Sequence, residues 1–160
     1  MSWKNRLQTE LTALAQLGVG SGGDQLRVDV PVGRIECALV SVDAVGCSFD
    51  EVSLVTSQLA NHSTDQLKAV SEKLSQQIRY LLEPICPIEI DPAGATVQMR
   101  SSPPQQDDDG TKYYELLVRQ GGLSLRRYAR AKGQPRQSVS ANVTREVLVR
   151  LASDFVDAVS

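Results

Sequence analysis

Apolar residues recur at steps of three or four in three stretches of the chain, and each stretch is predicted to form an amphipathic helix. The central helix is expected from Ser63 to Leu82. Ser63 and Gln66 have the spacing of a capping box, and Pro84 is expected to end the helix. Its apolar face comprises Leu67, Val70, Leu74, Ile78, Leu81 and Leu82. Such a one-sided helix needs an apolar surface to pack against.

The other two helices are expected at the beginning and the end of the printed sequence. The first covers Ser2 to Leu17, and Gly18 follows it at the position where a helix-ending glycine belongs. The last runs from about Asn142 to Val159, and the triplet Asn142-Val143-Thr144 at its start offers residue types that are favoured as helix caps.

Between the helices, apolar and polar residues alternate, which is typical of half-buried strands. Three strands are expected before the central helix, within 26–32, 35–42 and 47–57, with a turn at Gly33-Arg34 and a bulge or short loop at Asp50-Glu51. Four are expected after it, within 88–91, 95–99, 112–120 and 123–130. The last two form a hairpin around Gly121-Gly122. The polar stretches near 18–24, 101–110 and 131–140 are expected to be flexible loops.

The resulting order is α-βββ-α-ββββ-α within a single domain of residues 1–160. Short turns between consecutive strands favour antiparallel pairing, and helices that separate blocks of strands favour the α+β class. We therefore expect a single antiparallel sheet of about six to seven strands, with three helices mainly on one face.

Composition adds constraints on the core and on the location of the protein. Aromatic residues make up only 4% of the chain, so the core must consist mainly of Val, Leu, Ile and Ala. Cys37, Cys47 and Cys86 are an odd number without close pairing, which favours reduced core thiols over a disulfide framework. Residues 1–18 lack the apolar run of a signal peptide, and no later run could span a bilayer. We expect a cytoplasmic protein without membrane contact.

The sequence contains no motif that indicates catalysis, a cofactor or a metal. Gly18 to Gly23 matches G-x-G-x-x-G, but a dinucleotide site needs this motif after a strand and before a helix, and here the order is reversed. His62 is the only histidine and has no closely paired cysteines. The acidic run at 107–109 lacks the alternation of a calcium loop. We expect no enzymatic activity, no cofactor and no metal site.

Charge is distributed unevenly along the chain. Residues 111–150 hold nine Lys or Arg and two Glu, a local charge of +7, whereas the preceding 110 residues have a local charge of −7. The candidate partner-binding residues in this basic stretch are Arg119, Arg126, Arg127, Tyr128, Arg130, Lys132 and Arg136. Together with the tyrosines they could contact RNA. The same arginines could instead pair with acids of the N-terminal half, or form a docking surface for an acidic protein segment.

The order of a first helix, three strands, a second helix, further strands and a closing helix resembles the type III secretion chaperone-like fold. The resemblance covers most of the chain and rests on element order. It implies a cytoplasmic homodimer that binds an extended segment of a partner protein on its sheet and helix surfaces.

The favoured function is therefore a non-enzymatic protein-binding or adaptor module, and the resemblance implies a chaperone-like action on its partner protein. Strand addition at a sheet edge and packing on an apolar patch are the expected means of binding. The alternative is an RNA-contacting accessory domain that uses the basic hairpin and loop of residues 119–136.

Overall fold

The computed structural model describes residues 2–17 and 24–160. The helix stop expected at Gly18, the glycine motif and all but the last residue of the loop expected near 18–24 lie outside the described residues. The elements in chain order are α1 (Trp3–Leu17), β1 (Asp24–Val30), β2 (Gly33–Val42), β3 (Gly46–Thr56), α2 (Thr64–Gln77), β4 (Ile85–Asp91), β5 (Thr96–Ser101), β6 (Gln105–Asp107), β7 (Gly110–Arg119), β8 (Gly122–Ala131), β9 (Gln137–Val139), β10 (Ala141–Thr144) and α3 (Arg145–Val159).

The α+β class and the single antiparallel sheet are confirmed, but within the described residues the sheet has ten strands rather than six to seven. Seven of them form the main order β1-β2-β3-β8-β7-β5-β4. The short strands β6, β9 and β10 pair with β7, β8 and β3, and they lie in stretches expected to be loops or the start of the last helix. The turn between β6 and β7 consists of Asp108 and Asp109, and the Asp107 carboxylate accepts the backbone N–H groups of Asp109 at 2.9 Å and of Gly110 at 3.0 Å.

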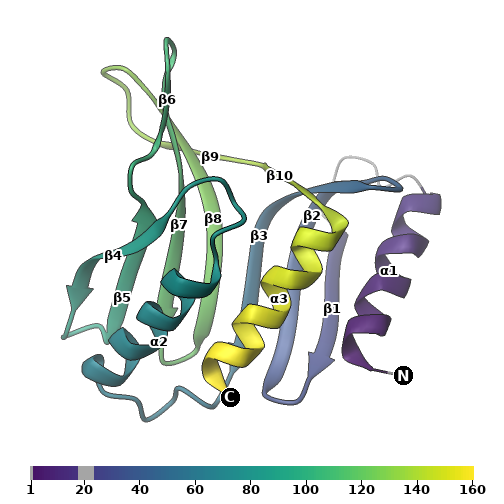
Figure 1. Ribbon diagram of the computed structural model, residues 1–160, viewed down its shortest axis with the longest axis horizontal. Coiled ribbons are helices and arrows are strands. Elements are labelled where there is room, and N and C mark those ends of the chain that lie inside the picture. Colours follow the sequence, from purple (N-terminus) through teal and green to yellow (C-terminus); the bar gives the residue numbers. More distant parts are fainter. Residues whose placement is uncertain (1, 18–23) are drawn as a thin grey trace.

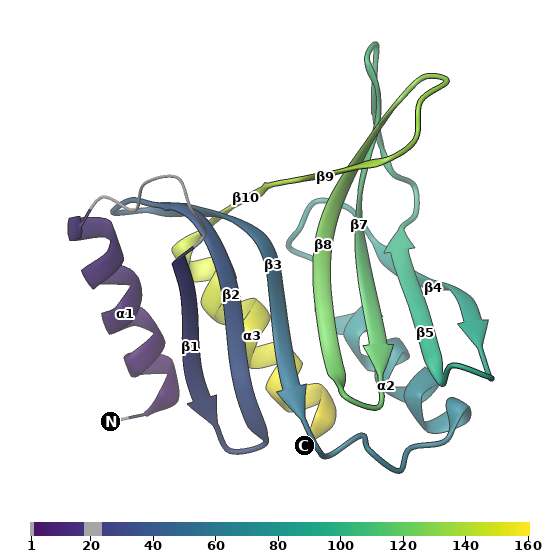
Figure 2. The same ribbon diagram turned by 180° about the vertical axis from the view of Figure 1, so that it is seen from behind.

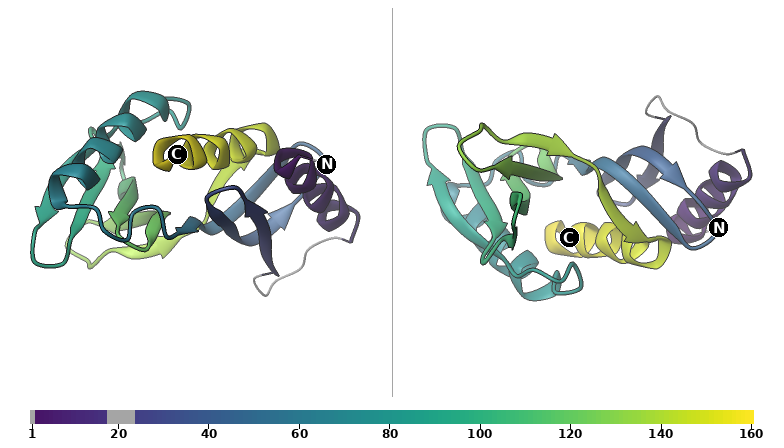
Figure 3. Two further views of the ribbon diagram at one scale, coloured as in Figure 1. Left: turned by 90° about the horizontal axis from the view of Figure 1, so that it is seen from below. Right: turned by 90° about the horizontal axis from the view of Figure 1, so that it is seen from above.

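The helices and the sheet form two layers (Figure 1). Figure 2 shows the molecule from behind, with the sheet in front of α2 and α3. In the end-on views of Figure 3, α2, α3 and α1 follow one another along the same side of the curved sheet. The core between the layers consists mainly of Leu, Val and Ile, as composition predicted, with Phe49 and Phe155 as its two phenylalanines.

The central helix begins as predicted but ends early. The Ser63 hydroxyl accepts the Gln66 backbone N–H at 3.2 Å, and the Gln66 side chain accepts the Ser63 N–H at 2.8 Å, so the capping box is confirmed. The helix ends at Gln77, well before Pro84 requires it to.

Two long-range contacts hold the residues that follow α2 in a path that is not helical. The Tyr80 hydroxyl donates to Asp154 of α3 at 2.6 Å, and Glu83 pairs with Arg127 of β8 at 3.0 Å. The prediction that Leu82 lies on a buried helical face is therefore wrong, since it is 95% exposed with φ 67°. Tertiary contacts here override a local helical pattern.

The last helix starts later than predicted. Thr144 of the triplet at the predicted start is its cap, and the Thr144 hydroxyl accepts the Val147 N–H at 3.1 Å. Asn142 lies instead in β10, where it pairs with Ser48 of β3. Backbone pairing with β3 takes these residues out of the helix.

The β3 and β8 strands pair directly along only part of their length, from Val52 to Val55 on β3. Beyond Val52 they diverge, and residues 137–144, which we call the strap, lie between them (Figure 1). The bulge expected at Asp50-Glu51 is confirmed, because Asp50 has no partner in β2 while its two neighbours do. The hydroxyl of Ser140 in the strap donates to Asp50 at 2.9 Å, which ties the strap to the bulge.

The two turns that the sequence predicted at glycines differ in outcome. The turn expected at Gly33-Arg34 lies at Pro31-Val32, and Gly33 already belongs to β2. The predicted β7–β8 hairpin is confirmed, with Arg119 opposite Gly122. A Cβ on Gly122, whose φ is +146°, would lie 1.9 Å from the Leu54 carbonyl oxygen. Glycine therefore allows β8 to approach β3 closely.

The cysteines match the expectation of free thiols. Cys37 and Cys47 are buried, while Cys86 is half-buried on β4. Burial raises the pKa of Cys37 to about 12 and that of Cys47 to about 11. Both buried thiols therefore stay protonated at neutral pH.

Candidate functional site: a cleft beside the strap

The seven residues predicted to form one partner surface are divided between the two faces of the sheet. Successive side chains of a strand point to opposite faces. Arg126 thus lies on the face away from the helices and Arg127 on the helix side, where it lines a cleft with Glu83. The basic stretch is continuous in sequence but not in space.

On the face away from the helices, charges alternate across neighbouring strands. Arg126 of β8 pairs with Glu51 of β3 and lies opposite Glu115 of β7, which lies opposite Arg100 of β5. Glu115 is only 6% exposed and accepts hydrogen bonds from Arg136 at 2.6 Å and from Gln98 at 2.8 Å. The alternative that these arginines pair with acids of the N-terminal half holds for Arg126 with Glu51.

Arginine and tyrosine side chains stack above this row of charges. The Arg136 guanidinium lies 4.0 Å from the Tyr128 ring centre, and Arg100 lies 4.7 Å from that of Tyr113. The two tyrosine rings are 5.9 Å apart. Hydrogen bonds to Tyr113 and Glu115 raise the pKa of Arg136 further above its usual value. Tyr128 and Arg136 are thus already engaged within the protein.

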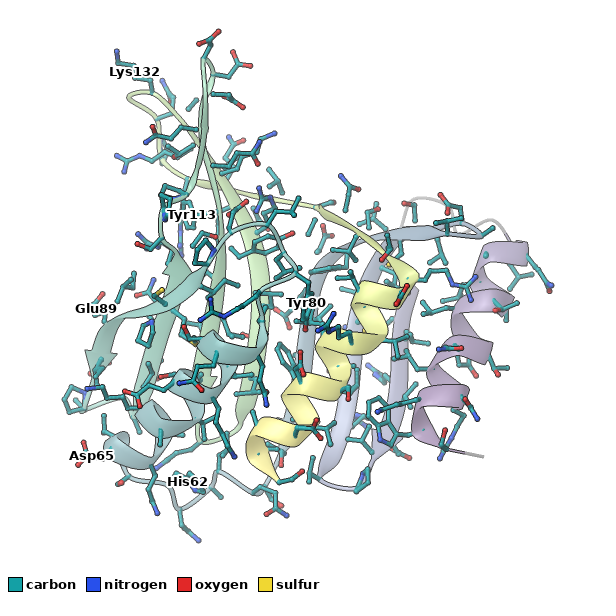
Figure 4. All side chains as sticks on the ribbon, viewed as in Figure 1. His62, Asp65, Tyr80, Glu89, Tyr113 and Lys132 are labelled. Atoms are coloured by element: carbon teal, nitrogen blue, oxygen red, sulfur yellow. The ribbon has the colours of Figure 1, made fainter. Side chains whose placement is uncertain are left out.

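The remaining three candidates are exposed cations at separate places. Arg119 lies at the turn between β7 and β8, whereas Arg130 lies at the opposite end of this hairpin. The Arg130 Nε donates to the Gln134 carbonyl at 3.1 Å. Lys132 lies in the loop between β8 and β9, at the upper end of the molecule in Figure 4. No single surface contains all seven residues.

A cleft of about 810 Å³ lies on the helix side, where β3 and β8 diverge. Its walls come from residues 80–84 after α2, residues 103–105 before and within β6, the strap and the start of α3. Tyr80, labelled in Figure 4 beside α3, lines one side of it. Lys112 and Tyr114 of β7 and Arg127 of β8 also line it, so the cleft forms where five segments of the chain meet.

An ion pair and an aromatic ring form the polar part of the cleft. Arg127 donates to Glu83 at 3.0 Å and to the Gln105 side chain at 2.9 Å, and its guanidinium lies 4.4 Å from the Tyr114 ring centre. The side chains of Arg127 and Glu83 are only 10% and 11% exposed. Such a pair is strongly coupled, because removal of either partner leaves a nearly buried charge.

Leu82 is an apolar residue of the cleft whose side chain is almost fully exposed. Leu81 before it is buried and Glu83 after it is tied to Arg127, so the left-handed backbone at Leu82 turns its side chain outward. Burial and the hydrogen bond to Asp154 raise the pKa of Tyr80, and burial raises that of Tyr114. Both phenols are therefore protonated and available as neutral contact surface.

The cleft residues Leu82, Glu83 and Lys112 were missed by the sequence analysis. A signal existed for Lys112, because strand alternation places it on the same face of β7 as Tyr114. The same rule separates Arg126 from Arg127. For Leu82 there was none, since its side chain turns outward only because the helix ends at Gln77.

The other residues considered for catalysis or metal binding do not form a site. His62 is half-buried near the start of α2, at the far end of the molecule from Lys132 (Figure 4). Within the described residues, no group of three or more His, Cys, Asp or Glu side chains is placed to hold a metal ion. The described helices include none with the length and apolarity needed to cross a membrane.

No family model, curated protein or solved structure matches this chain.

Proposed function

We propose that this chain is a non-enzymatic protein-binding module that holds an extended segment of a partner protein in the cleft beside the strap. Leu82 is the observation that carries the proposal, since it is 95% exposed on the cleft wall at φ 67°. This backbone conformation costs a leucine about 1 kcal/mol, and its exposed side chain gains nothing from folding. A partner that buries Leu82 would offset that cost.

The composition of the cleft walls supports this role. Pro84, Pro103, Pro104 and Val139 accompany Leu82. Among the polar side chains, Glu83 and Gln105 are fixed by hydrogen bonds from Arg127. Binding sites commonly combine an apolar lining with a small number of fixed polar groups. The walls therefore suit side chains of an extended segment.

The ionisable groups of the cleft suit binding better than proton transfer. Glu83 is held by Arg127, and the Tyr80 hydroxyl by Asp154. The raised pKa values of Tyr80 and Tyr114 keep both phenols neutral near pH 7. A general acid or base needs a pKa near the working pH.

The cleft is a better route than strand addition at the β4 edge. Pro87 has no backbone N–H to donate, and the β4–β5 register shifts between Pro87 and Glu89. Both features protect a sheet edge against an added strand.

Protein is favoured over RNA as the partner. The basic residues are divided between two faces, and Arg126, Arg127 and Arg136 already have carboxylate partners. A nucleic-acid footprint normally gathers its cations on one face. We further propose a cytoplasmic homodimer, on the resemblance to type III secretion chaperones, and light scattering behind a sizing column measures the oligomeric state.

The test is selection of a displayed peptide library on the immobilised protein, followed by calorimetry with the selected peptides. Leu82→Ser should weaken their binding by about tenfold or more, because burial of a leucine is worth roughly that much. Leu17→Ser is the matched control, since Leu17 is 80% exposed on α1, outside the cleft lining. Selected peptides that bind both variants equally well, or no selected peptide at all, would contradict the proposal.

A further inference from the structure

The charges on the cleft walls are not balanced. The ionisable side chains that line the cleft are Tyr80, Glu83, Lys112, Tyr114 and Arg127. With both phenols neutral, the cleft presents two cations and one carboxylate. Its walls therefore carry one excess positive charge.

This excess charge is located on Lys112. Glu83 and Gln105 already accept from Arg127, and the Tyr114 ring covers its guanidinium. In residues 2–17 and 24–160, Lys112 forms no ion pair, and its side chain is exposed. Lys112 is thus the cation that a ligand can reach.

The neighbours of Lys112 leave room for such a ligand. Its cross-strand partner on β8 is Ala129, which has only a methyl side chain, and its partner on β6 is Gln105. Pro103 and Pro104 lie in the wall beside β6. Because Lys112 is exposed, its attraction to an opposite charge should fall as the salt concentration rises.

We infer that the cleft selects a protein segment that carries an aspartate or glutamate close to a large apolar residue, with the carboxylate on Lys112 and the apolar side chain on Leu82. This inference rests on the proposed function and specifies its ligand. Lys112 and Leu82 line the same cleft, so one extended segment contacts both.

The test uses the same displayed library and then synthetic pairs of selected peptides, in which each Asp or Glu is replaced by Asn or Gln. Acidic residues should be enriched beside apolar ones, and the amide versions should bind about fivefold to tenfold more weakly. Lys112→Gln should cause the same loss and abolish the preference for the acidic version. Lys112→Arg should retain it, and higher salt should reduce it.

Lys132→Gln is the matched control, because Lys132 is also an exposed lysine but lies in the loop between β8 and β9, outside the cleft lining. This substitution should leave unchanged both the affinity for the selected peptides and their preference for the acidic over the amide version. Peptides that depend on Leu82 but show no acidic preference, or keep it in Lys112→Gln, would overturn this inference while the proposed function stands.

Other results would overturn both proposals. One is that no peptide binding depends on Leu82. Another is tight binding of labelled oligouridine RNA that is lost in Lys112→Gln, which would assign the cleft to nucleic acid. A dimer that dissociates on Leu82→Ser in light scattering would show that a second copy occupies the cleft.

Discussion

The two ends of the junction between β3 and β8 are built differently. At one end the strands pair directly, and Gly122 lets its backbone approach the Leu54 carbonyl closely. At the other end they diverge around the Asp50 bulge, the strap fills the gap, and the cleft lies beside it. The same pair of strands thus provides a tight seam and an open site. We expect stability to depend mainly on the seam, and binding to depend on the open end.

Gly122→Ala should have the largest effect, because it places a methyl group against the Leu54 carbonyl and forces alanine into a conformation that is nearly restricted to glycine. We expect a loss of more than about 3 kcal/mol in unfolding free energy, measured by urea denaturation. Gly121→Ala is the neighbouring control, since a Cβ there has no atom within 4 Å. Its loss should stay within about 1 kcal/mol. Equal losses would contradict a tight seam at Gly122.

Glu83→Ala should have the next largest effect, because it leaves Arg127 nearly buried without its carboxylate. The expected loss is about 3 kcal/mol. A double-mutant cycle with Arg127→Ala measures the coupling, and the cycle for Glu51 and Arg126 on the exposed face is its control. The exposed pair should give only about 0.5 kcal/mol. Similar coupling in both pairs would show that the cleft does not isolate its ion pair from water.

Alkaline pH should destabilise the protein both at Cys37 in the core and at the tyrosines of the cleft. Burial raises the pKa of Cys37 to about 12 and also raises that of Tyr80 and Tyr114 above its ordinary value. Because the unfolded groups ionise first, their contribution to stability is complete below about pH 9 and is lost as pH rises toward the folded-state values. The melting temperature should fall from pH 9 to 11. Tyrosinate absorbance measures whether Tyr80 and Tyr114 ionise before unfolding, which would contradict their burial.

Leu82→Gly should have the smallest effect on stability and the opposite sign. Glycine adopts φ 67° without strain but gains more freedom in the unfolded chain, so we expect between no change and a gain of about 1 kcal/mol. Peptide binding should nevertheless be lost. A clear loss of stability, measured by the same urea denaturation, would show that Leu82 supports the fold rather than a partner.

Local signals predicted much of the fold. The capping box at Ser63, the bulge at Asp50 and the hairpin at Gly122 all follow from chemistry within a few residues. The end of α2 did not, because contacts with Asp154 and Arg127, far along the chain, decide where the helix stops.

The candidate site was harder to predict than the fold. The local charge identified the basic stretch, but residues that are neighbours in this stretch of sequence lie on different faces of the sheet. The cleft brings Leu82 and Lys112 together from segments that share no pattern, so their meeting depends on the path of residues 78–84. Arg127 was among the predicted residues, although its role in the cleft depends on Glu83.

The strap also has a consequence for biosynthesis. Ser140 lies 90 residues after the Asp50 to which it is tied, and α3, which packs on β3, follows directly after the strap. While the ribosome is still making β4 to β8, the apolar side of β3 therefore lacks its covering helix. Exposed apolar strands of this kind favour aggregation. The nascent chain should need protection, for example by a chaperone, until residues 137–159 have emerged.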